Sequence, residues 1–403
     1  MRKQISIEKI YALSVTIAMG LLFFANAEQQ TYYDGSNVSL GIGKLFYIPC
    51  GIALICSFHI KRKRDSLDIA LYWLIGVSCI SSLIHPAEVS SILEFSLVRF
   101  VFAIMCFKSV KDIDPFLIIR YVALASPFII FPHYILTNPF AFGGNRYGGF
   151  YGDANFLALA LNIVIAMCYL AYKQEKKKKL MIVYLLSIIG AVPLILVGMS
   201  RGGIIGLVLI IIAMLGDVWK SSKVSFSLIL IILLVGSSTF VNNFGDILTL
   251  IEYRFSGEAS TDAGGAMARW DGVVSVLNVF GNRPDLIPFG IGFGNTLPHL
   301  KDYMQYGFYL KIAIHNTYFS LLYEAGLLSL LLYLNIYLYA FRILMKNKKY
   351  FLIGLLMSAM LSLATLPGVA FMPGWILLFF LCNPALAKDT NKRRFDSHLK
   401  SLS

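Results

Sequence analysis

The sequence predicts an all-α protein, a polytopic bundle of membrane-spanning helices. Of its 403 residues, 58% are hydrophobic, and the mean hydropathy is +0.72. A soluble domain could not close a polar surface over so much apolar material, because ordinary domains are about 45–50% apolar. Two further observations predict the same class: long apolar runs recur along the chain, and the basic residues lie mainly between them.

The apolar runs are about 16 to 25 residues long, enough for a helix to cross a hydrocarbon core about 30 Å thick. We expect about 12 spanning helices on this criterion. They cover residues 10–27, 40–59, 69–84, 92–107, 115–135, 155–172, 180–199, 203–219, 224–241, 316–341, 350–366 and 372–387. The first run follows a short basic segment and has no small-residue cleavage pattern, so we expect it to be retained rather than removed as a signal peptide.

Lysines and arginines are concentrated in alternate segments between the runs. If the N-terminus is cytoplasmic, most of the 35 basic residues lie on the inner side, including Lys108, Lys111 and the lysines of 176–179. This distribution follows the positive-inside rule. We therefore interpret the formal charge of +13 as a topology signal rather than a nucleic-acid-binding surface. Both termini are expected in the cytoplasm.

The runs divide the chain into four parts. Residues 1–241 hold the first nine of about 12 expected helices, and 242–314 form one large periplasmic loop containing short helices. Residues 315–387 hold the last helices, and 388–403 form a basic cytoplasmic tail. Polar chemistry is concentrated in the loop and where the chain re-enters the membrane, which places the candidate site on the outer face.

Several arginines lie on the expected outer side, against the general charge trend. Arg201 stands between two apolar runs with almost no loop, and Arg146, Arg254 and Arg269 lie in outer loops. A guanidinium group matches phosphate oxygens in bidentate geometry, so these residues are candidates for binding an anion. Asn155 follows a glycine-rich loop and could cap the next helix, offering free N–H groups to the same ligand. An ordinary tight loop would look similar.

His315 stands where the chain re-enters an apolar run. A neutral imidazole is well matched to accepting a proton near pH 7, which makes His315 a candidate base. The alternative is a helix-start histidine satisfied by backbone or water. Asn316 and Tyr318 either hydrogen-bond a sugar or begin the helix and anchor it at the membrane interface.

Other features exclude some chemistries. The six cysteines all lie within or beside apolar runs, so we expect neither a disulfide framework nor a metal site. Gly290, Gly292 and Gly294 have the spacing G-x-G-x-G, but no strand-to-helix unit surrounds them. A dinucleotide-binding fingerprint is therefore not expected.

These motifs together resemble the O-antigen ligase and O-antigen polymerase superfamily. The resemblance covers about residues 146–330 and follows the order and the expected membrane face of the motifs. It is carried by Arg146-Tyr147-Gly148-Gly149, Asp153-Ala154-Asn155, Ser200-Arg201-Gly202-Gly203, Arg269, the segment 288–294, His315-Asn316-Thr317-Tyr318 and Glu324-Ala325-Gly326-Leu327-Leu328.

The resemblance implies a membrane glycosyltransferase that needs no metal or cofactor. Such an enzyme moves a glycan from undecaprenyl diphosphate to an acceptor hydroxyl at the outer face of the bacterial inner membrane. On this basis the catalytic residues are His315, Arg201 and Arg269, and the substrate-binding residues are Arg146, Arg254, Asn155, Asn316 and Tyr318. The expected partners are an undecaprenyl-diphosphate-linked oligosaccharide, membrane lipids and a chain-length regulator protein, without nucleic acid.

The acceptor distinguishes two activities within the superfamily. A polymerase extends another lipid-linked repeat unit, whereas a ligase transfers the glycan to lipid A–core. We favour a polymerase because Ser329 departs from the ligase pattern and because of the Gly-Ile-Gly-Phe-Gly segment, residues 290–294. A lipid-linked oligosaccharide flippase or other transporter is an alternative from a different class, but no two related halves are evident.

Overall fold

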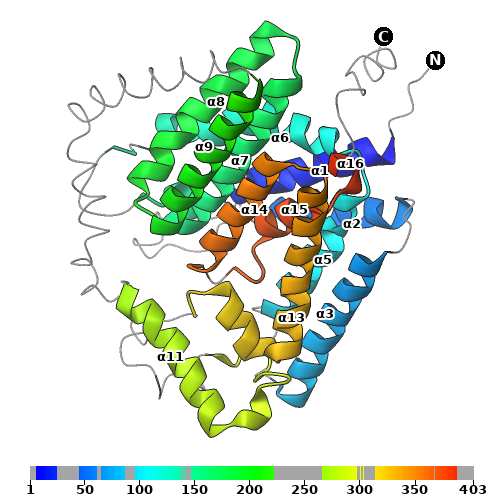
Figure 1. Ribbon diagram of the computed structural model, residues 1–403, viewed down its shortest axis with the longest axis vertical. Helices are drawn as coiled ribbons and strands as arrows, with labels where there is room; N and C mark the ends of the chain where they lie inside the picture. The colour runs from blue at the N-terminus through cyan, green and yellow to red at the C-terminus, as the bar shows by residue number, and fades with distance from the viewer. Residues whose placement is uncertain are drawn as a thin grey trace.

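The computed structural model describes residues 6–24, 45–60, 65–86, 96–137, 139–140, 147–221, 266–296, 300, 303, 314–366 and 368–387. All regular secondary structure in these ranges is helical, without strands (Figure 1). The predicted all-α class is therefore confirmed for the described part of the chain.

The helices follow the apolar runs closely. In chain order they are α1 (Ile7–Leu22), α2 (Tyr47–His59), α3 (Ser66–Ile84), α5 (Ser96–Phe107), η3 (Lys108–Lys111), α6 (Pro115–Leu136), η4 (Gly149–Tyr151), α7 (Ala154–Gln174), α8 (Lys178–Val197), α9 (Arg201–Ser221), α11 (Ala266–Asn282), η6 (Pro284–Leu286), α13 (Thr317–Lys346), α14 (Tyr350–Leu363), α15 (Met372–Leu381) and α16 (Pro384–Ala387). Each expected run overlaps one of these helices, except 224–241, which lies outside the described residues.

Six of the described helices are long and apolar enough to cross a membrane: α3, α6, α7, α8, α9 and α13. Three shorter apolar helices, α2, α14 and α15, accompany them. α15 has only 10 residues, or about 15 Å of helix, against a hydrocarbon core of about 30 Å. The expected number of about 12 spanning helices is therefore not established by these lengths.

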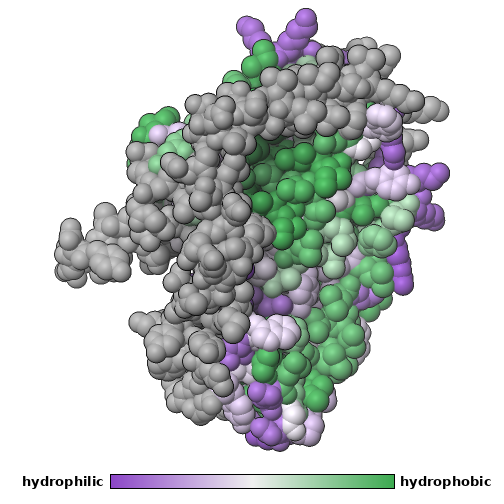
Figure 2. Space-filling model, turned by 60° about the vertical axis from the view of Figure 1, so that its left-hand side comes forward, coloured by the Kyte–Doolittle hydropathy of each residue, from purple (hydrophilic) through white to green (hydrophobic). Residues whose placement is uncertain are grey.

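Burial separates a central helix from peripheral ones. In the most apolar window of α7, 89% of the residues are buried, compared with 33% for α8 and 28% for α9. The exposed positions of α8 include Ile182, Leu185 and Ile189, and hydrophobic residues cover much of the surface that is not grey in Figure 2. An exposed apolar surface of this extent is expected where lipid replaces water as the surrounding medium.

α13 is broken rather than continuous, which the uninterrupted run 316–341 did not predict. Gly326 has φ 80° and ψ 176°, far from helical values, and the helix turns sharply there (Figure 1). The first half, 317–325, packs beside α11, and the second half continues along α3. The break leaves amide and carbonyl groups without partners inside the helix, and these must be satisfied elsewhere.

The segment 287–296, which we call the glycine bracket, satisfies these groups. Ile291 and Gly292 donate backbone hydrogen bonds to the carbonyls of Tyr323 and Glu324, both at 2.9 Å. In return, the amide of Leu327 donates to the Ile287 carbonyl at 2.8 Å. The bracket thus closes both ends of the broken helix.

Close backbone contact explains the glycines at this crossing. A Cβ on Gly326 would lie 2.3 Å from the Pro288 carbonyl oxygen, and one on Gly290 would lie 2.6 Å from that of Tyr323. Both glycines also have positive φ, which side chains disfavour. The Gly-x-Gly-x-Gly pattern therefore has a packing role here.

The bracket also ties α13 to the C-terminal end of α3. Ser81 Oγ donates to the Glu324 carbonyl at 2.7 Å, and Asn295 Nδ2 donates to the His85 carbonyl at 2.9 Å. The buried Glu324 carboxylate accepts from Thr296 Oγ1 at 2.8 Å. One end of α3 is thus attached to the bracket through neutral hydrogen bonds.

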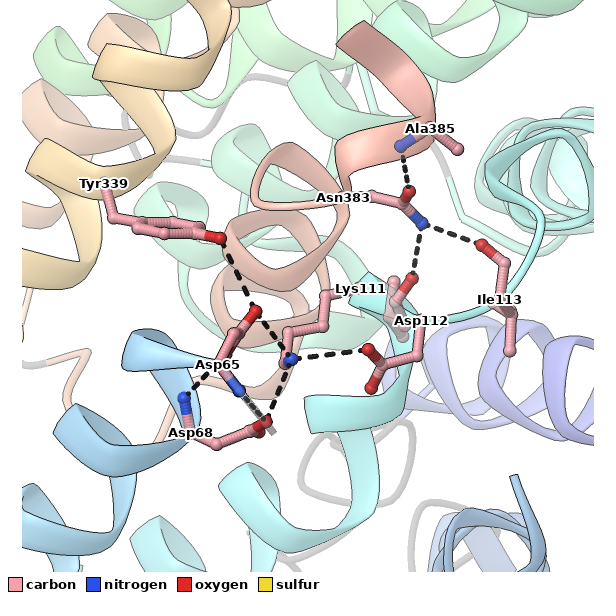
Figure 3. A network of polar contacts seen from close by, with 9 residues as sticks. Asp65, Asp68, Lys111, Asp112, Ile113, Tyr339, Asn383 and Ala385 are labelled. Carbon is pink, nitrogen blue, oxygen red and sulfur yellow. Dashed lines mark hydrogen bonds and ion pairs between the residues drawn. The ribbon is translucent and has the colours of Figure 1, made fainter. Parts of the chain in front are cut away.

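The other end of α3 carries an ionic group, the lysine cluster of Lys111, Asp65, Asp68 and Asp112 (Figure 3). Lys111 Nζ lies 3.2 Å from Asp65 and 3.3 Å from both Asp68 and Asp112, and its side chain is 1% exposed. Burial alone would lower the pKa of Lys111, but attraction to Asp112, Asp65 and Asp68 raises it above the usual value.

The lysine cluster revises one sequence interpretation. Lys108 and Lys111 were expected to contribute positive charge to the inner surface, but they are 3% and 2% exposed. Lys111 is instead neutralised by carboxylates from α3 and from its own neighbour Asp112. Its charge therefore holds helix ends together, and its place on the inner side of the membrane remains a prediction.

Candidate active site

The start of α7 is the first part of the candidate site. Asp153 caps the helix, because its carboxylate accepts from the amides of Asn155 and Phe156. Asn155 is therefore not the cap that we expected. It lies in the first helical turn, 4% exposed, and its Oδ1 accepts a hydrogen bond from Ser200 Oγ at 2.8 Å.

That bond joins α7 to the start of α9. The Ser200 hydroxyl also accepts from the Gly203 amide at 3.1 Å, so Ser200 acts as the helix cap. Arg201 follows as the first residue of α9 and is partly exposed. Within the described part of the chain, its side chain makes no hydrogen bond or ion pair.

The position of Arg201 is unfavourable for helix stability. The N-terminus of a helix carries a partial positive charge, so a cation there loses about 0.3–1 kcal/mol relative to a favourable placement. The guanidinium group and the positive end of the helix dipole together attract an anion. The free N–H groups at a helix start add hydrogen-bond donors. Arg201 therefore does not favour the helix as a cap, and its binding of an anion remains a prediction.

Small residues bring α9 close to its neighbours. A Cβ on Gly203 would lie 2.3 Å from Ala158 Cβ in α7, and one on Gly202 would lie 2.5 Å from Thr365 Oγ1 beyond α14. Ser362 Oγ donates to the Gly202 carbonyl at 3.3 Å. The start of α9 is thus held between α7 and the C-terminal end of α14.

The start of α13 meets the same end of α14. Thr317 Oγ1 donates to the Leu366 carbonyl at 2.6 Å and accepts from the Gly368 amide at 2.8 Å. The Tyr318 hydroxyl donates to the Met360 carbonyl at 2.9 Å. Asn316 Oδ1 caps α13 by accepting from the amides of Tyr318 and Phe319.

We call the meeting point of these three helix starts the junction. The junction is held together by neutral hydrogen bonds and close contacts. Its members are Asn155, Ser200, Gly202, Ser362, Thr365, Leu366 and Thr317. Arg201 lies beside Ser200, and His315 stands two residues before Thr317, partly buried. Residues far apart in sequence are therefore brought to one end of the bundle.

Arg269 lies near the start of another helix, α11. The buried face of this helix contacts the first half of α13 through a small core that includes Val276, Phe280 and Tyr323. The Phe280 and Tyr323 rings are 5.9 Å apart between centroids. The helix that carries Arg269 is thus packed on the half-helix that His315 precedes.

The remaining predicted residues divide into two groups. Asn316 and Tyr318 have the helix-start roles that we gave as their alternative, because their polar atoms bond backbone at the start of α13 and in α14. Arg146 and Arg254 lie outside the described residues. The predictions of sugar or diphosphate binding by these four residues remain predictions.

Residues 147–152 form a loop that we call the glycine loop. The structure shows a polar group beside it that the sequence did not predict. The Tyr147 hydroxyl lies 2.8 Å from His133 Nδ1 and 2.9 Å from Thr137 Oγ1. Burial raises the pKa of Tyr147, so the phenol stays protonated at neutral pH. His133 lies in an apolar run, and no local pattern distinguishes it from a packing residue.

The described residues contain no group of three or more histidine, cysteine, aspartate or glutamate side chains that could hold a metal ion. The candidate residues that could act on a substrate carry guanidinium groups and an imidazole. Such a set can stabilise a developing anion and accept a proton.

The fold is that of a helical membrane protein, with six described helices long and apolar enough to span a bilayer and the junction where three helix starts meet. Residues 186–334 match the model of a protein family described as O-antigen ligase. The matched segment contains Arg201, Arg269 and His315, and it confirms the resemblance to the O-antigen ligase and O-antigen polymerase superfamily. A search of curated proteins found no match to the chain.

Proposed function

We propose that the protein is a membrane glycosyltransferase that polymerises undecaprenyl-diphosphate-linked repeat units into O-antigen or a related surface polysaccharide. The observation that carries the proposal is the junction, which brings the helix starts bearing Arg201 and His315 to one end of the bundle. The family match over residues 186–334 supports the same class of reaction.

The reaction breaks the bond between the anomeric carbon and the diphosphate oxygen. A new bond forms from the acceptor hydroxyl to that carbon, while the diphosphate leaves with the bond's electron pair. Arg201 and Arg269 stabilise the growing negative charge on the diphosphate, and such electrostatic contacts are strongest where water is excluded. His315 accepts the proton from the acceptor hydroxyl. The proposal uses neither a metal nor a cofactor.

Substrate binding is assigned to groups around these three residues. Arg146 and Arg254 add cationic contacts to the diphosphate, and Asn155, Asn316 and Tyr318 orient the sugars. We place the junction on the periplasmic face of the bacterial inner membrane, with both termini in the cytoplasm. A chain-length regulator protein is a proposed further partner.

Transfer to lipid A–core is the second candidate, favoured by the description of the matching family as O-antigen ligase. The features that favoured polymerisation have structural contacts: Ser329 Oγ lies 3.5 Å from Ser78 Oγ, and the bracket glycines contact α13. We retain polymerisation because of the Ser329 departure from the ligase pattern. The acceptor is therefore the point that an experiment must decide.

A flippase or other transporter is less well supported. The broken helix α13 is a feature that transporters share, since their half-helix ends bind substrate. In this protein the ends at Gly326 are closed by backbone hydrogen bonds from the glycine bracket. The backbone groups at this break therefore have partners within the chain and are not available to bind a substrate.

A deletion strain distinguishes the candidates. Lipopolysaccharide with a single repeat unit on its core would indicate a lost polymerase, and bare core with accumulated lipid-linked polymer would indicate a lost ligase. Complementation with Arg201→Ala or His315→Ala should fail at normal protein levels. Full restoration of polysaccharide length by both variants would remove these residues from the site and overturn the proposed function.

A further inference from the structure

The glycine loop lies between His133 and the turn that carries Arg201. On one side, a Cβ on Gly149 would lie 2.6 Å from the His133 ring, so the loop backbone rests directly on the imidazole. On the other side, the Tyr147 amide donates to the Val197 carbonyl at 3.4 Å, and a Cβ on Gly198 would lie 3.3 Å from the Tyr147 carbonyl oxygen. The loop is therefore in contact with both.

The loop is also attached at its C-terminal end. It leads into Asp153 and Asn155, and Asn155 Oδ1 accepts from Ser200, next to Arg201. Gly149 has φ +52° and Gly152 has φ +77°, conformations that glycine adopts readily and that do not rigidify a chain. The order of this loop must come from its contacts.

His133 supplies several of these contacts. The residue is 0% exposed, and its ring centroid lies 5.1 Å from that of Phe150 and 6.4 Å from that of Phe24. Its Nδ1 shares a hydrogen bond with the Tyr147 hydroxyl at 2.8 Å, whereas its Nε2 is buried and has no hydrogen-bond partner among the described residues. Leaving a buried nitrogen unpaired is costly, so packing alone would favour an apolar ring at this position.

We propose that His133 is a positioning residue: through its hydrogen bond to Tyr147 it holds the glycine loop against the Val197–Ser200 turn and so fixes Arg201 for binding a diphosphate. The inference rests on the proposed function, because it requires Arg201 to bind a diphosphate. His133 itself is fully buried and does not touch substrate. Its effect passes through Tyr147 and the loop backbone.

The test measures equilibrium binding of undecaprenyl diphosphate to the purified full-length protein, with undecaprenyl monophosphate as the comparison lipid. Tyr147→Phe removes only one hydroxyl, and His133→Gln removes the nitrogen at the Nδ1 position. Each should weaken diphosphate binding by up to about tenfold, the usual range for one hydrogen bond. Monophosphate binding should change less than about twofold.

Two further variants separate positioning from general stability. His133→Asn places a polar atom on Cγ, where Nδ1 stands, and should recover most of the diphosphate affinity. The double variant His133→Gln/Tyr147→Phe should bind no more weakly than Tyr147→Phe alone, because that single change already removes the His133–Tyr147 bond together with the contact between Tyr147 and Thr137. Tyr134→Phe is the matched control, since it removes the bond from Tyr134 to the Gly190 carbonyl on α8 and not to the loop.

The outcomes are distinguishable from those of the proposed function. Wild-type affinity in Tyr147→Phe and His133→Gln, with weak binding in Arg201→Ala, would overturn the role of His133 alone. Equal loss for both lipids would also overturn it, because that result indicates general disruption. Unchanged diphosphate binding in Arg201→Ala would instead overturn the diphosphate site. If His133→Gln does not fold, Tyr147→Phe still decides the question.

Discussion

The two ends of the bundle use polar groups in opposite ways. At the lysine cluster, Lys111 is surrounded by three carboxylates at 3.2–3.3 Å and its side chain is 1% exposed. At the junction, the helix starts are joined by neutral groups, such as Asn155 to Ser200 and Thr317 to Leu366. Arg201 stands beside these bonds without a hydrogen bond or ion pair to any described residue.

The difference indicates which end is built for stability and which for chemistry. Charges that neutralise one another attract a ligand only weakly. A guanidinium group surrounded by neutral groups can still attract an anion strongly. Substitutions of charged residues should therefore affect folding at the lysine cluster and activity at the junction.

The largest effect is expected at the lysine cluster. Lys111→Met leaves Asp65, Asp68 and Asp112 close together without their cation, and breaking a buried ion pair typically costs about 3–5 kcal/mol. We expect a large loss of thermal stability in detergent, measured by size-exclusion chromatography after heating. Lys108→Met is the control, because the contacts of Lys108 Nζ, with the Tyr72 hydroxyl at 3.3 Å, the Met105 sulfur at 3.4 Å and the Tyr72 ring, are to neutral groups. Equal stability of Lys111→Met and the wild type would contradict the comparison.

The next largest effect is expected on catalysis. Arg201→Ala should lower kcat/KM for glycan transfer by about 10²–10³-fold, the usual result of removing one group that stabilises a developing anion. Its thermal stability should stay close to that of the wild type. Arg201→Lys should be intermediate, because lysine keeps the charge but not the bidentate geometry. Arg283→Ala, which removes an exposed arginine paired with Asp285 at 2.7 Å, should have wild-type activity.

A moderate effect is expected at the glycine bracket, which belongs to neither pattern. Gly326→Ala puts a Cβ 2.3 Å from the Pro288 carbonyl oxygen at φ 80°, and such strain typically costs about 1–3 kcal/mol. Because the first half of α13 follows His315, we expect stability and activity to fall together. Gly281→Ala in α11 is the control, since no atom lies within 4 Å of its added Cβ. A drop in stability without a drop in activity would show that the break in α13 does not affect the site at His315.

The smallest effect is expected from alkaline pH at the lysine cluster. The folded-state pKa of Lys111 is raised, so its contribution to stability is complete below the unfolded value of about 10.4 and is lost as pH rises through the folded value. Between about pH 7 and 9.5, the difference in melting temperature between wild type and Lys111→Met should stay constant. A difference that shrinks within that window would indicate a lysine that is already losing its proton.

The sequence predicted the helices well because immersion in lipid requires long apolar runs, and such runs are local. It also placed His315 and Asn316 at the mouth of a helix, where α13 begins. The lysine cluster was missed because Asp65 and Lys111 are distant in sequence and resemble solvated loop charges. The break at Gly326 was missed because one glycine in an apolar run does not show that another segment will cross there.

The candidate site was predicted in part. The resemblance pointed to Arg201 and His315, whose roles remain predictions, but the hydrogen bonds that bring their helices together involve Ser362 and Leu366, which no motif marks. His133 was missed for the same reason. Contacts between distant segments depend on packing, and a single sequence does not record them.

The glycine bracket has a consequence for exchanging specificity between related enzymes. Apart from the bond from Thr296 to the Glu324 carboxylate, the bonds of the bracket to α13 described above run from backbone to backbone, so they constrain few side chains beyond the glycines needed for close approach. A donor segment for 287–296 from an enzyme with a different sugar preference should dock in the same register if Gly290 and its counterpart Gly326 are kept. The break in α13 is thus a natural graft point for chimaeras.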